Sequence, residues 1–317
     1  TGINSHESLQ YLCANNIKHQ VGAVTYTQML NSKGGIESDL TVTCIEENKF
    51  RVVTASGVRT HDKKHILKYL NSSVNLKDIT DDFACFGIFG PKSRKLLTEI
   101  FGDYFSNNDF KFGTGKKIIK LNIELWFQRI SYVGELGWEI YIPTEKSKEI
   151  YELIVSLEKK FGLVHAGAHA MDIMRMEKGY LHWGHDISPA ENPFEAGLEF
   201  ALKLNKKEDF IGKEFLINNK NIRKKKLFMF VLNDSTPGNP LLLHDEPIYF
   251  DGKIVGETTS GNYSFLYNKN LAYGYVDATL NIDITNSVFE IEVAKKKYKA
   301  SVLNKALHDP ENNFIRD

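Results

Sequence analysis

The spacing of apolar residues changes along this chain, and it predicts stretches of different architecture. Helical spacing at 8–14 is followed by alternating apolar and polar positions at 21–30, 36–45 and 49–55, and helical spacing returns at 60–70. Alternation with a period of two is typical of half-buried strands, whereas apolar residues three and four apart are typical of helices. The first stretch is therefore predicted to be a small sheet with helices beside it.

The middle of the chain repeats this mixture. A short apolar strand at 83–89 leads into a helix at 92–101, and two further strands are expected at 125–132 and 138–142. A long amphipathic helix is predicted at 147–161. This order of elements resembles a split β-α-β layer.

The last third predicts a barrel. A helix at 168–178 is expected to end at Gly179, where a left-handed C-cap costs little. Beyond about residue 212, short strands recur between turn residues, which argues for a small antiparallel barrel. Its strands are expected at 227–232, 247–249, 253–259, 272–276 and 289–293. The predicted fold class is therefore α+β.

Composition narrows the classes of protein. The 317 residues hold 40 Lys plus Arg and 40 Asp plus Glu, so overall charge gives no reason to expect binding to nucleic acid or to an anionic membrane. No apolar run approaches the roughly 20 residues that span a bilayer, and the first residues lack the order of a signal peptide. Scattered cysteines without ligand spacing indicate buried thiols. We expect a soluble protein of the cytoplasm, or of the mitochondrial matrix in a eukaryote, without nucleic-acid or membrane partners.

The first segment with chemical potential is YTQMLNSKGGIESDLTV, which begins at Tyr26. Gly34 and Gly35 permit a tight hairpin turn, and the returning strand places Glu37 and Asp39 on one face. A carboxylate is thus held on a rigid strand. The alternative is the polar face of an ordinary hairpin, which this segment alone favours because acids near turns are common.

The second segment is SYVGELGWEIYIP, in which two glycines flank Glu135. Glycines at such a bend allow a ligand to approach the backbone. A carboxylate beside Tyr132 and Trp138 suits a flat heterocycle with adjacent N–H donors, because both oxygens can accept while a ring stacks nearby. A plain hairpin turn with core aromatics explains the segment equally well.

The third segment is AHAMDIMRMEKGYLHWGHDI, with Arg175 on the helix and Trp183 beyond its terminal glycine. The cluster of His182, His185 and Asp186 lacks a further partner at a recognisable metal-ligand spacing. A satisfied structural histidine is the commoner outcome, so we predict no metal site. The sequence also lacks a Walker motif, GxGxxG and GxSxG, which argues against a P-loop, a dinucleotide fold and a serine hydrolase.

Taken together, the three segments resemble the folate-binding aminomethyltransferase family of the glycine cleavage T-protein, over essentially the whole chain. The hairpin segment and KGYLHWGHDISPAENPFEAGLEFALKL look closer to the C-terminal folate portion of FAD-dependent dimethylglycine and sarcosine dehydrogenases. FIGKEFL and SGNYSFLYNKNLAYGYV fit the same family.

The resemblance implies three units around a central folate channel. These are an α+β domain from residues 1–80 and 165–215, a ferredoxin-like layer at 81–164, and a C-terminal antiparallel β-barrel at 216–317. The chain begins at Thr1. The family has a further strand and helix before the equivalent point, and the dehydrogenases have an FAD domain before that. We therefore expect an N-terminal truncation, with FAD bound only in an upstream domain absent from this chain.

The resemblance also implies roles for single residues. Asp39 corresponds to the catalytic carboxylate, Tyr26 lies in the folate wall, and Glu135 holds the pterin. Arg175 and Trp183 complete the pocket. The implied cofactor is tetrahydrofolate, and the implied reaction is methylene transfer from an N-methyl amine or its iminium to give 5,10-methylenetetrahydrofolate.

Two other functions stay open from the sequence. One is a free-standing aminomethyltransferase or folate-dependent demethylase, and an FAD-type GxGxxG region upstream would argue against it. The other is a non-catalytic folate-binding or regulatory module, which folate binding without transfer would favour.

Overall fold

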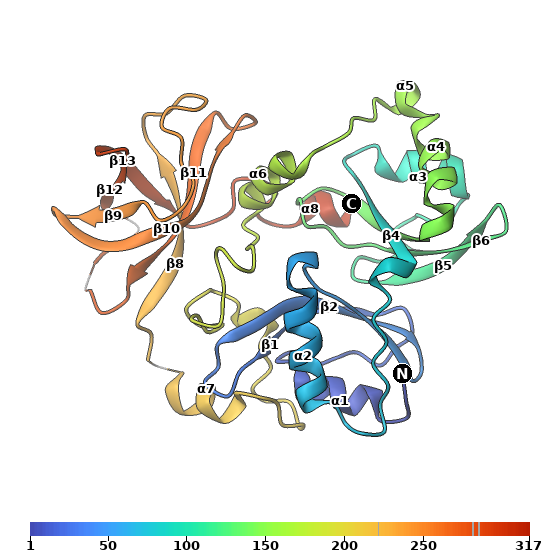
Figure 1. Ribbon diagram of the computed structural model, residues 1–317. Coiled ribbons are helices and arrows are strands. Elements are labelled where there is room, and N and C mark those ends of the chain that lie inside the picture. Colours follow the sequence, from blue (N-terminus) through green and yellow to red (C-terminus); the bar gives the residue numbers. More distant parts are fainter. Residues whose placement is uncertain (221, 281, 285) are drawn as a thin grey trace.

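A computed structural model describes residues 1–220, 222–280, 282–284 and 286–317. Three sheets organise these residues, and the last of them closes into a barrel (Figure 1). Helix α6 (Ala168–Lys178) lies between the barrel and the other two sheets. The mixed helix–strand architecture and the C-terminal antiparallel barrel predicted from the sequence are confirmed.

The first sheet has the order β1-β2-β3. Its strands are β1 (Val24–Leu30), β2 (Ile36–Glu46) and β3 (Lys49–Val53), and its helices are α1 (Ser5–Leu12) and α2 (Arg59–Tyr69). Leu40 and Val42 of β2 pack in a core with Leu9 and Ile66 from the helices. Because side chains alternate across a strand, Asp39 points to the sheet face away from that core.

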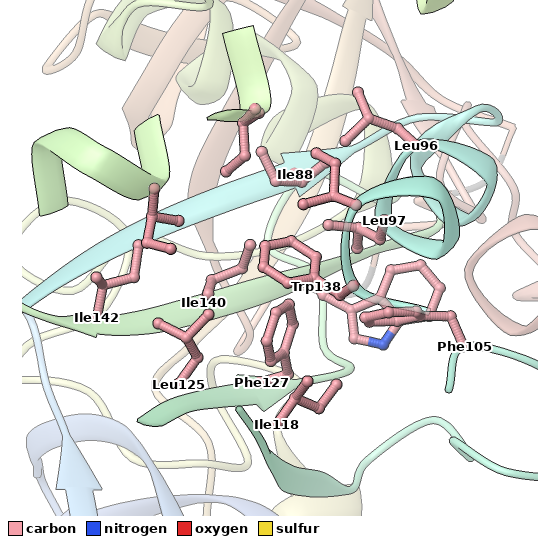
Figure 2. Close-up of a cluster of buried hydrophobic side chains, with 14 of the residues drawn as sticks. Ile88, Leu96, Leu97, Phe105, Ile118, Leu125, Phe127, Trp138, Ile140 and Ile142 are labelled. Atoms are coloured by element: carbon pink, nitrogen blue, oxygen red, sulfur yellow. The ribbon is translucent and has the colours of Figure 1, made fainter. Parts of the chain in front are cut away.

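The second sheet has the order β4-β7-β6-β5 and carries helices over one face. Its elements are β4 (Phe83–Phe89), α3 (Ser93–Phe101), β5 (Gly115–Lys120), β6 (Ile123–Gln128), β7 (Gly137–Pro143), α4 (Ser147–Val155) and α5 (Glu158–Phe161). Apolar side chains from these strands and helices form one core, in which Trp138 meets Phe105 edge to face (Figure 2). Trp138 is fully buried in this core.

The barrel runs in the order β10-β11-β8-β13-β12-β9, and it closes because β9 pairs with β10. Its strands are β8 (Lys225–Leu232), β9 (Pro247–Phe250), β10 (Lys253–Ser264), β11 (Lys269–Asp277), β12 (Val288–Val293) and β13 (Lys296–Leu303). The remaining helices are α7 (Lys213–Asn219), α8 (Asn313–Arg316) and the 3-10 turns Ser56–Val58, Thr80–Asp82, Thr144–Lys146 and Glu199–Ala201. The predicted domain boundary at 215–216 falls within α7, and the division into domains stays a prediction.

The long helix predicted at 147–161 is wrong, because α4 ends at Val155 and α5 begins at Glu158. The Ser156 hydroxyl donates to the Leu153 carbonyl oxygen at 2.7 Å, and such side-chain bonds to the backbone compete with a continuing helix. Strands β5 and β13 and helix α7 were not predicted. In both strands lysines occupy much of the sequence and blur the alternation.

None of the helices in the described ranges is both long enough and apolar enough to cross a membrane.

We predict that Trp138→Ala lowers the free energy of unfolding by about 3–5 kcal/mol, because it opens a cavity in the aromatic core. Urea denaturation measures this change. The control is Ile119→Ala on β5, where the side chain is 62% exposed and a change within about 0.5 kcal/mol is expected. Equal stabilities of the two variants would contradict the core assignment of Trp138.

Candidate active site

Asp39 sits on β2, directly opposite Gln28 of β1. Its carboxyl group is half-buried, and Gln28 Nε2 donates to Oδ1 at 2.8 Å. Burial raises the pKa of Asp39 to about 6, although hydrogen bonds from Gln28 and Tyr26 oppose the rise. Asp39 is thus poised to exchange a proton near neutral pH.

Tyr26 lies beside Asp39 on the neighbouring strand. Burial and the adjacent Asp39 charge raise the pKa of Tyr26 well above its usual value, so the phenol stays neutral. The ring of Phe200 stacks on Tyr26 with centroids 5.9 Å apart, and Phe200 is 66% exposed. The sequence reasoning did not identify Phe200, although it lies in the segment quoted for the resemblance. Tyr26 and Phe200 together form an aromatic surface next to the carboxyl group.

Tyr132 bonds the loop that follows α6. Its hydroxyl donates to the Leu181 carbonyl oxygen at 3.0 Å. Burial raises the pKa of Tyr132, and its surroundings include the charges of both Arg175 and Asp39. The sequence reasoning treated Tyr132 only as a neighbour of Glu135, whereas in the structure its ring also stacks on that of Tyr180, with centroids 6.3 Å apart.

Arg175 is fully engaged with protein groups. Its guanidinium donates to Asp186 Oδ2 at 2.5 Å, to Asp172 Oδ1 at 2.9 Å and to Ser260 Oγ at 2.8 Å. Its side chain is 2% exposed, and that of Asp186 is 0% exposed. Arg175 thus links α6 to the following loop and to β10 of the barrel.

Trp183 packs at the start of β2, close to the Asp39 strand. Its indole Nε1 donates to the Ile36 carbonyl oxygen at 3.0 Å. Its ring lies 5.7 Å from the ring of His61 on α2. Trp183 and Tyr26 pack against the same apolar cluster, so both line one region of the first unit.

Glu135 lies in a different set of contacts. Its Oε1 is 2.8 Å from Nε2 of His308, which follows the last barrel strand. The adjacent Gly134 packs against the side chain of Lys178 at the end of α6. The structure therefore groups Tyr26 with Asp39, holds Arg175 in a separate network with Asp172, Asp186 and Ser260, and places Glu135 against the C-terminal segment.

The histidines of the third segment gather near the surface. The ring of His185 lies 4.7 Å from that of His182 and 6.0 Å from that of His244 on the loop between β8 and β9. Across the part of the chain that the structure describes, no group of three or more His, Cys, Asp or Glu side chains could hold a metal ion.

The arrangement of the three sheets is that of an aminomethyltransferase. The crystal structure of glycine cleavage system aminomethyltransferase T from Bartonella henselae superposes with a TM-score of 0.84 and covers 98% of this chain and 82% of its own. The sequence identity is 21%, so this likeness concerns the fold.

Family models match both parts of the chain. Residues 1–206 match the GCVT N-terminal domain, and residues 225–309 match the glycine cleavage T-protein C-terminal barrel domain. The chain belongs to the glycine cleavage T-protein family, and it is an aminomethyltransferase-type domain.

Curated relatives include proteins much longer than this chain. Human mitochondrial dimethylglycine dehydrogenase is 36% identical over 99% of this chain, a stretch that makes up 36% of that protein. The aminomethyltransferase of Halothermothrix orenii is 32% identical over 87% of this chain and 76% of its own length. The chain thus spans about a third of the dehydrogenase.

We predict that Asp39→Asn stabilises the fold at neutral pH. A carboxyl whose pKa rises from 3.8 to about 6 on folding favours the folded state when protonated. That contribution is present below about pH 4 and is lost as the pH rises through about 6. The variant should therefore exceed the wild type by up to about 3 kcal/mol at pH 7.5 and match it near pH 4.

Urea unfolding at the two pH values measures this difference. Asp103→Asn, which changes an exposed aspartate, is the matched control and should alter stability at neither pH. A loss of stability in Asp39→Asn that is equal at both pH values would contradict the burial cost.

We predict that Arg175→Met destabilises the protein by about 3–5 kcal/mol, because Asp186 would remain as an unpaired buried charge. The double variant Arg175→Met/Asp186→Asn should recover part of this loss, since it removes the charge. Thermal unfolding compares the two. If the double variant is less stable than the sum of the single changes, the ion pair is not the source of the loss.

Proposed function

We propose that this chain is a tetrahydrofolate-dependent domain that transfers a methylene unit from an N-methyl amine or its iminium, giving 5,10-methylenetetrahydrofolate. We further propose that it forms the C-terminal part of a protein similar to the dimethylglycine and sarcosine dehydrogenases. The observation that carries this proposal is Asp39, a half-buried carboxyl with a pKa raised to about 6, beside the half-buried ring of Tyr26 and the exposed ring of Phe200. Membership of the T-protein family supports it.

The side chains suit tetrahydrofolate. A pterin is flat and bears adjacent N–H donors, so it needs aromatic faces and carboxylate acceptors. Phe200 exposes most of its ring next to Tyr26, and Glu135 keeps part of its carboxylate accessible at 21% exposure. The proposed roles are therefore a folate wall at Tyr26, pterin binding at Glu135 and a pocket completed by Trp183.

We propose that Arg175 supports the shape of the pocket. Because its donors bond Asp186, Asp172 and Ser260, the side chain is rigid and its charge is offset by two carboxylates. We propose that it shapes the pocket through α6 and Tyr132.

Asp39 is the proposed proton acceptor. Tetrahydrofolate, when bound, would supply the two amine nitrogens that take up the methylene carbon, and the demethylated amine would leave. The Asp39 carboxylate would accept at an oxygen the proton that a tetrahydrofolate nitrogen gives up. Gln28 orients the group by donating to Oδ1. The ionised carboxylate also stabilises the positive charge of an iminium, and the aromatic side chains limit access of water.

The rest of the reaction requires partners outside this chain. We propose that an upstream FAD domain of the full-length protein oxidises the methylated amine. The folate-dependent domain formed by the present chain then receives the one-carbon unit. The alignment with about a third of human dimethylglycine dehydrogenase supports this arrangement. The similarity to the Halothermothrix orenii aminomethyltransferase favours the alternative of a free-standing transferase.

We predict that Asp39→Asn slows methylene transfer by about 10²–10⁴-fold and changes tetrahydrofolate affinity little, because the variant keeps the shape of the side chain and loses the base. Calorimetric titration measures binding, and chromatography of 5,10-methylenetetrahydrofolate measures transfer from formaldehyde. The wild-type rate should rise with pH through about 6, as Asp39 ionises.

The same assays separate the rival functions. Asp103→Asn should transfer at the wild-type rate. Unchanged transfer in Asp39→Asn would remove Asp39 from the mechanism. Tetrahydrofolate binding without transfer, in the wild type joined to its dehydrogenase portion, would favour a non-catalytic folate-binding module.

A further inference from the structure

An imidazole from the C-terminal segment touches the carboxylate assigned to the pterin. His308 Nε2 lies 2.8 Å from Glu135 Oε1, and the side chains are 10% and 21% exposed. On the other side of the ring, Nδ1 is 3.2 Å from the Tyr267 hydroxyl. If that hydroxyl donates to Nδ1, the ring proton sits on Nε2. The contact of Nε2 with Glu135 Oε1 is one of distance, because the direction of the ring N–H is not that of a hydrogen bond.

A second carboxylate lies next to the same imidazole. Burial raises the pKa of Glu177, the Ser264 hydroxyl and His308 oppose the rise, and the Glu135 charge adds to it. The negative charges of Glu135 and Glu177 therefore oppose each other. His308 sits where a donor offsets that repulsion, so its loss would allow Glu135 to turn away.

The backbone of His308 is held firmly. Its N–H donates to the Glu177 carbonyl oxygen at 2.9 Å. The next residue, Asp309, pairs with Lys178 at 3.0 Å, and both of these side chains are 2% exposed. These two contacts fix the segment to the end of α6. The imidazole of His308 therefore has a defined position from which to orient Glu135.

We propose that His308 is a positioning residue for folate binding: it holds Glu135 Oε1 so that the rest of the carboxylate points at the N–H groups of the pterin. The inference rests on the proposed function, in which Glu135 binds the pterin. His308 acts through Glu135 and does not itself contact folate. Tyr267 fixes the orientation of the ring. The C-terminal segment thereby becomes part of the folate site.

The test is a double-variant cycle read by calorimetric titration of the purified chain with tetrahydrofolate. Glu135→Gln should weaken binding by about tenfold or more, because it removes the charged acceptor of the pterin N–H groups. His308→Ala should weaken binding by about tenfold, because it removes the polar contact that holds Glu135 Oε1. The double variant should bind no weaker than Glu135→Gln within about twofold, because His308 has no other route to the ligand. If His308 had a purely structural role, His308→Ala would weaken binding by the same factor in the wild type and in Glu135→Gln.

Conservative variants sharpen the result. His308→Gln should recover much of the affinity, since its amide N–H can reach Glu135 as Nε2 does. In the transfer assay, the KM for tetrahydrofolate of His308→Ala should rise by about the same factor as its Kd.

A matched control lies in the same segment. Lys305→Gln breaks an exposed ion pair with Glu311 and should leave the tetrahydrofolate affinity unchanged. Urea unfolding of every variant identifies losses of affinity that come from misfolding. If His308→Ala does not fold, the affinity of His308→Gln is used in its place.

The outcomes separate the inference from the proposed function. Suppose that the wild type binds tetrahydrofolate and that Glu135→Gln weakens binding. The inference then fails, and the proposed function stands, if a folded His308 variant loses the same affinity in the wild-type and Glu135→Gln backgrounds or loses none. If the folded wild type does not bind tetrahydrofolate, the proposed function fails and the inference fails with it.

Discussion

The buried pair of Arg175 and Asp186 is the interaction on which the assembly of the site depends. Asp186 also accepts hydrogen bonds from the hydroxyls of Thr259 and Ser260 of the barrel and from the backbone N–H of His182. One carboxylate therefore organises α6, the loop after it and strand β10. Because a buried charge without its partner is strongly destabilising, these parts are stable only when they are docked together.

The proposed chemistry depends on a second carboxylate, the half-buried Asp39, whose charge has fewer compensating partners. Asp39 has Gln28 and Tyr26 as donors but no cation among its described contacts, and burial keeps its pKa near 6. A salt bridge would remove this cost and would also remove the proton affinity that a base needs. The two aspartates thus have different roles. Asp186 fixes the barrel against α6, and Asp39 keeps the proton affinity of a base.

The sequence predicted the hairpin of β1 and β2 because alternation and a Gly-Gly turn are local signals, and the pairing of Gln28 with Asp39 follows from that register. It failed between α4 and α5, where the helical spacing of apolar residues continues although the backbone leaves the helix at Leu157. It also missed Phe200 and His308. No local pattern reveals that a distant segment brings these rings against Tyr26 and Glu135, because such contacts arise only from tertiary packing.

Trp138 and Trp183 show why an aromatic residue near a carboxylate in the sequence does not by itself define a site. Strand alternation turns Trp138 into the helix-covered core, whereas Trp183 follows α6 and packs by the start of β2. The position of Asp39 bears on function in the same way. Its ionised carboxylate lowers the stability of the fold because it is held in a partly buried place. A module relieved of transfer would gain stability by replacing Asp39 with a neutral side chain, so its presence beside Tyr26 and Phe200 supports a catalytic domain over a purely binding one.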